Sequence, residues 1–163
     1  PGLQGGPHNH TTAGIAVAAK EASTPEFKQY AQNVVANAKV LAESLLGKGF
    51  TLVTGGTDNH LILLDLRSKN ITGKIAAKAI DRAGIVGNYN SIPFDPRKPF
   101  DPSGFRIGTP SITSRGMGKE EMVRLAGWMD QVVTNAADDK VIERVAAEVS
   151  EMCKGFPAPG IAV

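Results

Sequence analysis

Residues 90–116 read NSIPFDPRKPFDPSGFRIGTPSITSRG and hold five of the ten prolines in the chain. Proline restricts φ and has no backbone N–H, so the first half of this stretch can be neither a helix nor a central strand. Residues 104–109 predict a short strand, and Pro110 ends it. The pattern therefore predicts a rigid, irregular loop that leads directly into a strand.

One arginine lies in the middle of that strand. Arg106 stands between Phe105 and Ile107, a context that predicts a buried side chain. A guanidinium is planar and presents paired N–H donors, so an arginine on a strand suits two-point binding of a carboxylate. The same residue could instead form a structural salt bridge, because partnered arginines are common in folded proteins. Residue chemistry alone leaves both interpretations open.

Length and composition are those of an ordinary globular domain. The chain has 163 residues, of which 42% are hydrophobic and 21% are charged, which is typical of a single domain with a buried core. The formal net charge is +2 with both signs scattered, so the charge pattern indicates neither nucleic acid nor a membrane surface as a partner. No apolar run reaches the length of a membrane span and no signal-peptide pattern is visible, so we expect a cytoplasmic protein.

Residues that usually bind metals or form disulfides are few. Cys153 is the only cysteine, which excludes an intrachain disulfide and a cysteine-based zinc motif. We interpret it as a small hydrophobic residue on a helix. His8 and His10 are two residues apart and cannot share a helix face. We therefore predict no metal site.

Two glycines precede the first predicted helix. Gly5 and Gly6 lead into Pro7, and a helix with an apolar stripe is expected over residues 8–22. Glycines at a helix start can leave backbone N–H groups free to bind an anion, commonly a phosphate. A plain glycine turn is the alternative interpretation.

Hydrophobic periodicity, caps and breakers predict the other elements. Further helices are expected at 24–46, 72–83, 119–136 and 139–154, and strands at 50–53, 60–66, 85–87 and 104–109. This order predicts an α/β domain of α+β type, with a small sheet of three or four strands covered by helices mainly on one face. The first helix has no sheet partner nearby in sequence, so we expect it to bridge to another domain.

Four stretches together carry a resemblance to a known family. They are QGGPHNH at 4–10, GGTDNHLILLDL at 55–66, NSIPFDP at 90–96 and SGFRIGTPSITSRG at 103–116. The chain resembles the C-terminal part of serine hydroxymethyltransferase, a pyridoxal-phosphate enzyme of fold type I. The resemblance implies the end of a large domain with a bridging helix at 1–24 and a C-terminal small domain at 25–155. The prolines and glycines of the last residues predict a mobile tail at 156–163.

The resemblance also implies roles for particular residues. Arg106 would bind the carboxylate of serine or glycine. Gly5 and Gly6 would offer backbone N–H groups to the phosphate of pyridoxal phosphate across the interface of a homodimer, or of a dimer of dimers. Asn90 would contact the pterin ring of tetrahydrofolate. Arg115 would be a supporting residue near the site, more structural than catalytic.

The implied reaction interconverts serine plus tetrahydrofolate and glycine plus 5,10-methylenetetrahydrofolate. In the family, the lysine that forms the Schiff base with the cofactor precedes the QGGP turn, so the chain alone is expected to be inert. His60 and Asp58 belong to a family motif, and we assign them a role in the fold only. Tyr89 stands where many relatives carry a lysine. Action on α-methylserine, folate-independent cleavage of 3-hydroxy amino acids, and a non-catalytic dimerisation or binding domain therefore stay open.

Overall fold

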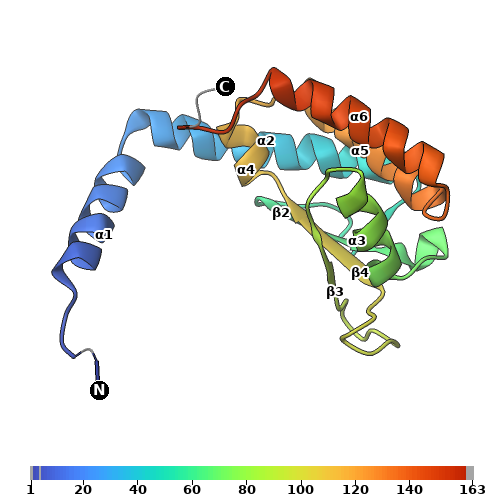
Figure 1. Ribbon diagram of the computed structural model, residues 1–163, viewed down its shortest axis with the longest axis horizontal. Helices are drawn as coiled ribbons and strands as arrows, with labels where there is room; N and C mark the ends of the chain where they lie inside the picture. Colours follow the sequence, from blue (N-terminus) through green and yellow to red (C-terminus); the bar gives the residue numbers. More distant parts are fainter. Residues whose placement is uncertain (1, 4, 161–163) are drawn as a thin grey trace.

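A four-stranded antiparallel sheet lies against a layer of helices in the computed structural model (Figure 1), which describes residues 2–3 and 5–160. The strand order is β1-β2-β4-β3. The strands are β1 (Thr51–Leu52), β2 (Leu61–Asp65), β3 (Asn88–Asn90) and β4 (Gly104–Gly108). The helices are α1 (Asn9–Ala22), α2 (Pro25–Gly47), η1 (Leu66–Lys69, a 3-10 turn), α3 (Gly73–Arg82), α4 (Pro110–Ser114), α5 (Lys119–Thr134) and α6 (Asp139–Lys154). The predicted fold class is confirmed.

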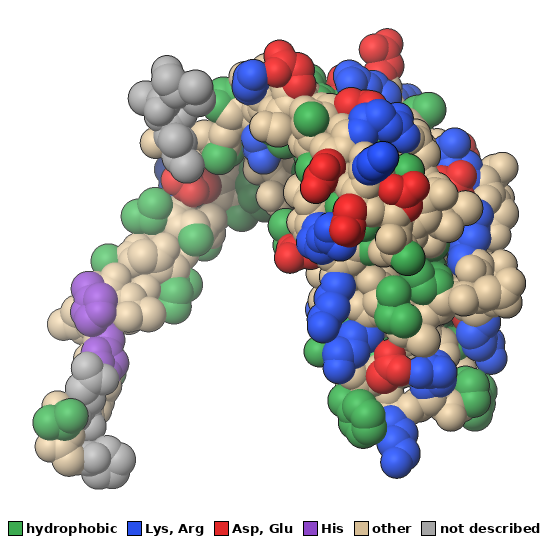
Figure 2. Space-filling view, turned by 45° about the vertical axis from the view of Figure 1, so that its right-hand side comes forward, with side chains coloured by type: hydrophobic (Ala, Val, Ile, Leu, Met, Phe, Trp, Pro, Cys, Tyr) green, Lys and Arg blue, Asp and Glu red, His purple; other side chains and the backbone are tan. Residues whose placement is uncertain are grey.

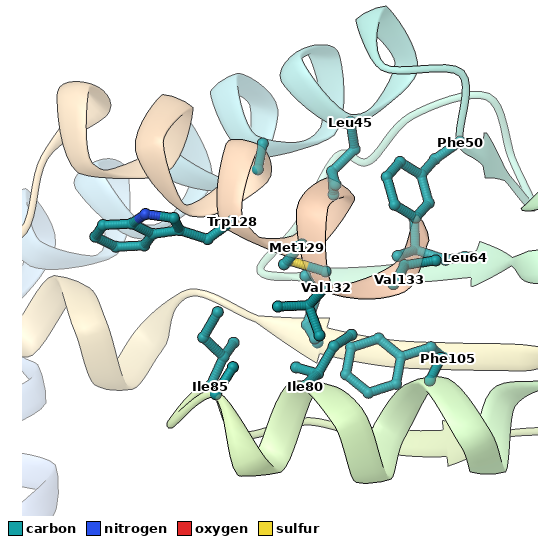
Figure 3. Packing of buried hydrophobic residues seen from close by; sticks show 14 of the residues in the cluster. Leu45, Phe50, Leu64, Ile80, Ile85, Phe105, Trp128, Met129, Val132 and Val133 are labelled. Carbon is teal, nitrogen blue, oxygen red and sulfur yellow. The ribbon is translucent and has the colours of Figure 1, made fainter. Parts of the chain in front are cut away.

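The central strands β2 and β4 place their apolar side chains on one face. In their register Leu64 pairs with Phe105, and Ile62 pairs with Ile107. Cross-strand partners share a face of the sheet, and all four side chains are buried. Figure 3 shows Leu64 and Phe105 meeting residues of α2, α3 and α5, so the core lies between this face and the helices.

Polar contacts fasten α2 to the segment that follows β4. Asn37, a buried residue of α2, donates from Nδ2 to Thr113 Oγ1 and to Met117 O, both at 2.9 Å. Thr109 Oγ1 donates to Val34 O at 2.8 Å. A buried polar group is costly unless it forms hydrogen bonds, so these bonds fix the position of α2 relative to the end of β4.

The first helix stands apart from this domain. No residue of α1 is buried, and Figure 1 shows the helix projecting away from the sheet, with the N-terminus at its far end. Its apolar residues Ile15 and Val17 are 65% and 59% exposed. That α1 bridges to another domain stays a prediction. The exposed apolar side chains of α1 are consistent with a second domain that packs against it.

The structure corrects one predicted element and adds a helix that the sequence analysis did not predict. The strand expected at 85–87 is wrong, because Ile85 N donates to Ile80 O at 3.1 Å and stays with the end of α3. Strand pairing begins only at Asn88, which lies opposite Arg106. Pro110 ends β4 as expected but also begins α4, since proline is well suited to the first position of a helix.

Candidate functional site

Arg106 is exposed, which corrects the prediction of a buried side chain. Its neighbours Phe105 and Ile107 point into the core, and strand geometry directs the side chain between them to the opposite face. The described helices cover the core face of the sheet, so the guanidinium lies on the open one. Among the residues that the structure describes, no carboxylate lies within salt-bridge distance of Arg106. The structural salt bridge that we kept as an alternative is therefore absent from this part of the chain.

The polar neighbour of Arg106 is an asparagine that the sequence analysis missed. Arg106 Nε donates to Asn88 Oδ1 at 3.3 Å. The two residues pair directly across β3 and β4. Asn88 lies two residues before Asn90 and therefore on the same face of β3. The two-residue period of a strand could have identified Asn88 from the sequence.

A shallow hollow beside Arg106 joins residues from three segments. Arg106, Asn88 and His60 line it together with backbone at Gly87 and Gly108. His60 and Arg106 come from motifs that are far apart in the sequence, and the pairing of β2 with β4 brings them together. The hollow therefore offers an arginine, an amide and an imidazole on one open surface.

Asn90 and Tyr89 lie on opposite faces of β3. Asn90 pairs with Gly104, two residues along from the Asn88–Arg106 pair and on the same face. Tyr89 pairs with Phe105 and so lies on the helix side of the sheet, where it is 42% exposed. The structure thus places Asn90 on the face of Arg106 and Tyr89 away from it.

The proline-rich loop between β3 and β4 is braced by one carboxylate. Asp95 accepts hydrogen bonds from Ile92 N at 3.3 Å, Arg97 N at 2.9 Å, Ser103 N at 2.9 Å and Ser103 Oγ at 2.8 Å. Burial alone would raise the pKa of Asp95, but the hydrogen bonds from Ser103, Arg97 and Ile92 outweigh it and lower the pKa from 3.8 to about 2. Asp95 therefore holds the two ends of the loop together while it is ionised.

Replacing Asp95 by asparagine is expected to lower the free energy of unfolding by about 1 kcal/mol at neutral pH, since the group is partly exposed and its interactions are screened. The pKa is lower in the folded chain than the usual 3.8, so the unfolded chain binds more protons between these values. The stabilisation is therefore complete above about pH 4 and is lost as pH falls toward about 2. Urea unfolding midpoints of the unchanged protein and of the Asp95→Asn variant, measured at about pH 7 and about pH 2.5, test this pH dependence. An equal gap at the two pH values would contradict it.

Arg115 binds the end of the last helix. Its Nε donates to Phe156 O at 2.6 Å and its Nη2 donates to Cys153 O at 3.3 Å. A cation at the C-terminus of a helix satisfies carbonyls that have no intrahelical partner and complements the helix dipole. The side chain thus fastens the C-terminal segment to α4. That segment was predicted to form a mobile tail from 156 onward, and residues 161–163 of it lie outside the described residues.

The turn before β2 is held by its own side chains. Thr57 Oγ1 donates to the carbonyl of the first residue of β2 at 2.7 Å, and Asn59 Oδ1 accepts from the N–H of the same residue at 2.8 Å. The carbonyl of His60 accepts from Thr109 N at 3.1 Å. Asp58 is exposed and makes no hydrogen bond within the described part of the chain. Local side-chain bonding by Thr57 and Asn59 therefore shapes this motif.

Gly5 and Gly6 lie near the far end of the projecting α1, away from the sheet (Figure 1). Both are exposed, and Gly6 has a φ of 72°, which favours glycine. His8 and His10 follow them in the sequence, and Figure 2 shows histidine side chains near the N-terminal end of the projecting helix α1. The structure therefore does not bring the two glycines and Arg106 together within one chain.

Charged side chains of both signs lie on the face of the domain that Figure 2 shows. The two signs are mixed over the upper part of this face, and lysine and arginine side chains are more frequent toward its lower end. Within residues 2–3 and 5–160, no three His, Cys, Asp or Glu side chains are grouped as metal ligands. No helix in the same residues is both long enough and apolar enough to cross a bilayer.

The fold and site define an α+β domain that presents an arginine and two asparagines on the open face of its sheet. Residues 1–129 match the family model described as serine hydroxymethyltransferase. Proteins of that name are 68% identical to the chain in Sorangium cellulosum and 63% in Desulfotalea psychrophila, each over 161 residues. In Acidothermus cellulolyticus the identity is 64% over 167 residues.

These alignments cover 99% of the chain but only 38–39% of each relative. The chain belongs to the serine hydroxymethyltransferase family and corresponds to the C-terminal part of its relatives. The recognition made from the four sequence motifs is confirmed.

Proposed function

We propose that this chain supplies the carboxylate-binding and folate-binding part of a pyridoxal-phosphate-dependent serine hydroxymethyltransferase. The reaction interconverts serine plus tetrahydrofolate and glycine plus 5,10-methylenetetrahydrofolate. The single observation that carries the proposal is Arg106, whose guanidinium lies on an open sheet face without an acidic partner among the described residues. An exposed arginine without such a partner, in a chain of this family, is suited to bind an amino-acid carboxylate.

In this proposal Arg106 orients the amino acid. Two-point binding fixes the carboxylate plane, and so determines which bond at the α-carbon faces the cofactor. When bound, pyridoxal phosphate supplies the electron sink that makes cleavage of that bond possible. The protein's own contribution here is binding and orientation.

The glycines at the start of the chain fit a phosphate group. A Cβ at Gly5 or Gly6 would meet nothing within 4 Å, so the backbone is open to a ligand. Exposed N–H groups before a helix are suited to bind an anion. Because α1 projects away from the sheet, we propose that these glycines serve the cofactor of a second subunit in a homodimer. The covalently bound lysine would come from residues outside this chain.

Asn90 is proposed to contact the pterin ring of tetrahydrofolate. It stands on the same face as Arg106, at the point where β3 enters the loop braced by Asp95. Tyr89, which raised the possibility of a folate-independent aldolase, lies on the other face. This placement supports the folate-dependent reaction over the folate-independent aldolase, and it does not bear on the α-methylserine alternative.

Glycine formation from serine by the full-length protein, loaded with pyridoxal phosphate, tests the proposal. We expect tetrahydrofolate to raise the rate by more than about tenfold, because the one-carbon unit needs a positioned acceptor. A rate that does not change when tetrahydrofolate is added would instead favour the aldolase. No turnover with or without folate would favour a non-catalytic binding domain.

A further inference from the structure

The side chain that contacts Arg106 is itself held in place. Asn88 Nδ2 donates to Tyr89 O at 3.0 Å, which orients the amide plane and leaves Oδ1 as the acceptor for Arg106 Nε at 3.3 Å. The backbone is constrained as well. A Cβ at Gly87 would collide with the buried Phe105 ring, so the residue before Asn88 packs directly on the core.

This contact divides the donors of the guanidinium. Arginine has five N–H donors, one on Nε and four on the two terminal nitrogens. Asn88 occupies the Nε donor, and no hydrogen bond from the terminal nitrogens of Arg106 is present among the described residues. A carboxylate that approaches Arg106 therefore meets the edge formed by Nη1 and Nη2 rather than the edge formed by Nε and Nη2.

We propose that Asn88 is a positioning residue that directs Arg106 to bind the substrate carboxylate end-on through Nη1 and Nη2. This inference rests on the proposed function. The neutrality of the amide matters, because an aspartate at this position would pair with the guanidinium and compete with the substrate. Asn88 instead accepts one hydrogen bond and leaves the full positive charge for the ligand.

A double-mutant cycle on the full-length, cofactor-loaded protein tests the inference, with the Kd of glycine measured by calorimetry. Asn88→Ala is expected to raise Kd about tenfold when Arg106 is present, the usual scale for a hydrogen bond to a charged group. In an Arg106→Lys background the same change is expected to leave Kd within about twofold, because lysine has no Nε donor to be held. Asn88→Asp, which keeps the size of the side chain, is expected to raise Kd as well.

The matched control is Asn33→Ala, which removes an exposed asparagine of α2 that contacts Gln29, and it should leave Kd unchanged. Equal effects of Asn88→Ala in both backgrounds would show a merely structural role and overturn the inference. An unchanged Kd for Asn88→Ala or for Asn88→Asp would also overturn it. If Arg106→Lys by itself leaves the Kd of glycine unchanged, the proposed function is wrong. This result differs from those that overturn only the role of Asn88.

Discussion

Replacing Arg106 by alanine in the full-length protein is expected to raise the Kd of serine and glycine by about 100-fold or more, because the change removes a charge-assisted, two-point hydrogen bond. The expectation follows from the position of the residue. Arg106 is exposed on the sheet face opposite the core and has no salt bridge among the described residues, so its loss disturbs little else. Calorimetric titration with glycine, together with kcat/KM for serine, measures the effect.

The design separates binding from folding. Arg82→Ala is the matched control, because Arg82 is also an exposed arginine and pairs only with Asp139 at the surface among the described residues. Surface pairs of this kind contribute little, so we expect Arg82→Ala to leave Kd unchanged. If Arg106→Ala binds glycine as tightly as the unchanged protein, the proposed role of Arg106 is wrong.

The largest expected effect on stability is that of Phe105→Ala. Phe105 is fully buried and sits in the central strand β4, where Figure 3 shows it beside Ile80. Truncating a buried phenylalanine removes its transfer free energy and leaves a cavity, which costs about 3–5 kcal/mol. Domains of this size are stable by about 5–15 kcal/mol, so the change would remove a large part of the total.

Urea unfolding measures this change, and Trp128 reports it. Trp128 is the only tryptophan in the chain and is buried in the same core, so its fluorescence changes when the core opens. Val123→Ala on α5 is the control, since Val123 is 52% exposed and a surface truncation should cost less than about 0.5 kcal/mol. A loss below about 1 kcal/mol for Phe105→Ala would mean that the side chain is not packed as the structure shows.

Local sequence rules were enough for most of the helices. The helix predicted at 139–154 agrees with α6, whose N-cap Asp138 accepts from two backbone N–H groups. Thr24 and Thr72 cap α2 and α3 as the pattern indicated. Caps and apolar periodicity act within one or two turns, so a single sequence carries this information. Short strands are different, because their ends depend on a partner strand, and the strand expected at 85–87 was misplaced for that reason.

The sequence named candidate site residues but did not indicate how the fold arranges them. The motifs pointed to Arg106 and Asn90, and β3 and β4 place both on one face. Asn88 escaped notice because its role depends on the cross-strand register. Arg115 stood in the same stretch as Arg106, yet its guanidinium donates to the carbonyls of Cys153, in the last turn of α6, and of Phe156, just after that helix.

The family and most of the helices could be predicted from the sequence alone, whereas the exposure of Arg106 was not predicted. The features that could be predicted depend on residue types and on their spacing over a few neighbouring positions, which the sequence shows directly. Three features became known from the folded chain: the face of the sheet that the helices cover, the contact of Asn88 with Arg106, and the separation of Gly5 and Gly6 from Arg106. Those outcomes depend on contacts between segments distant in sequence, because burial and register are properties of the assembled fold.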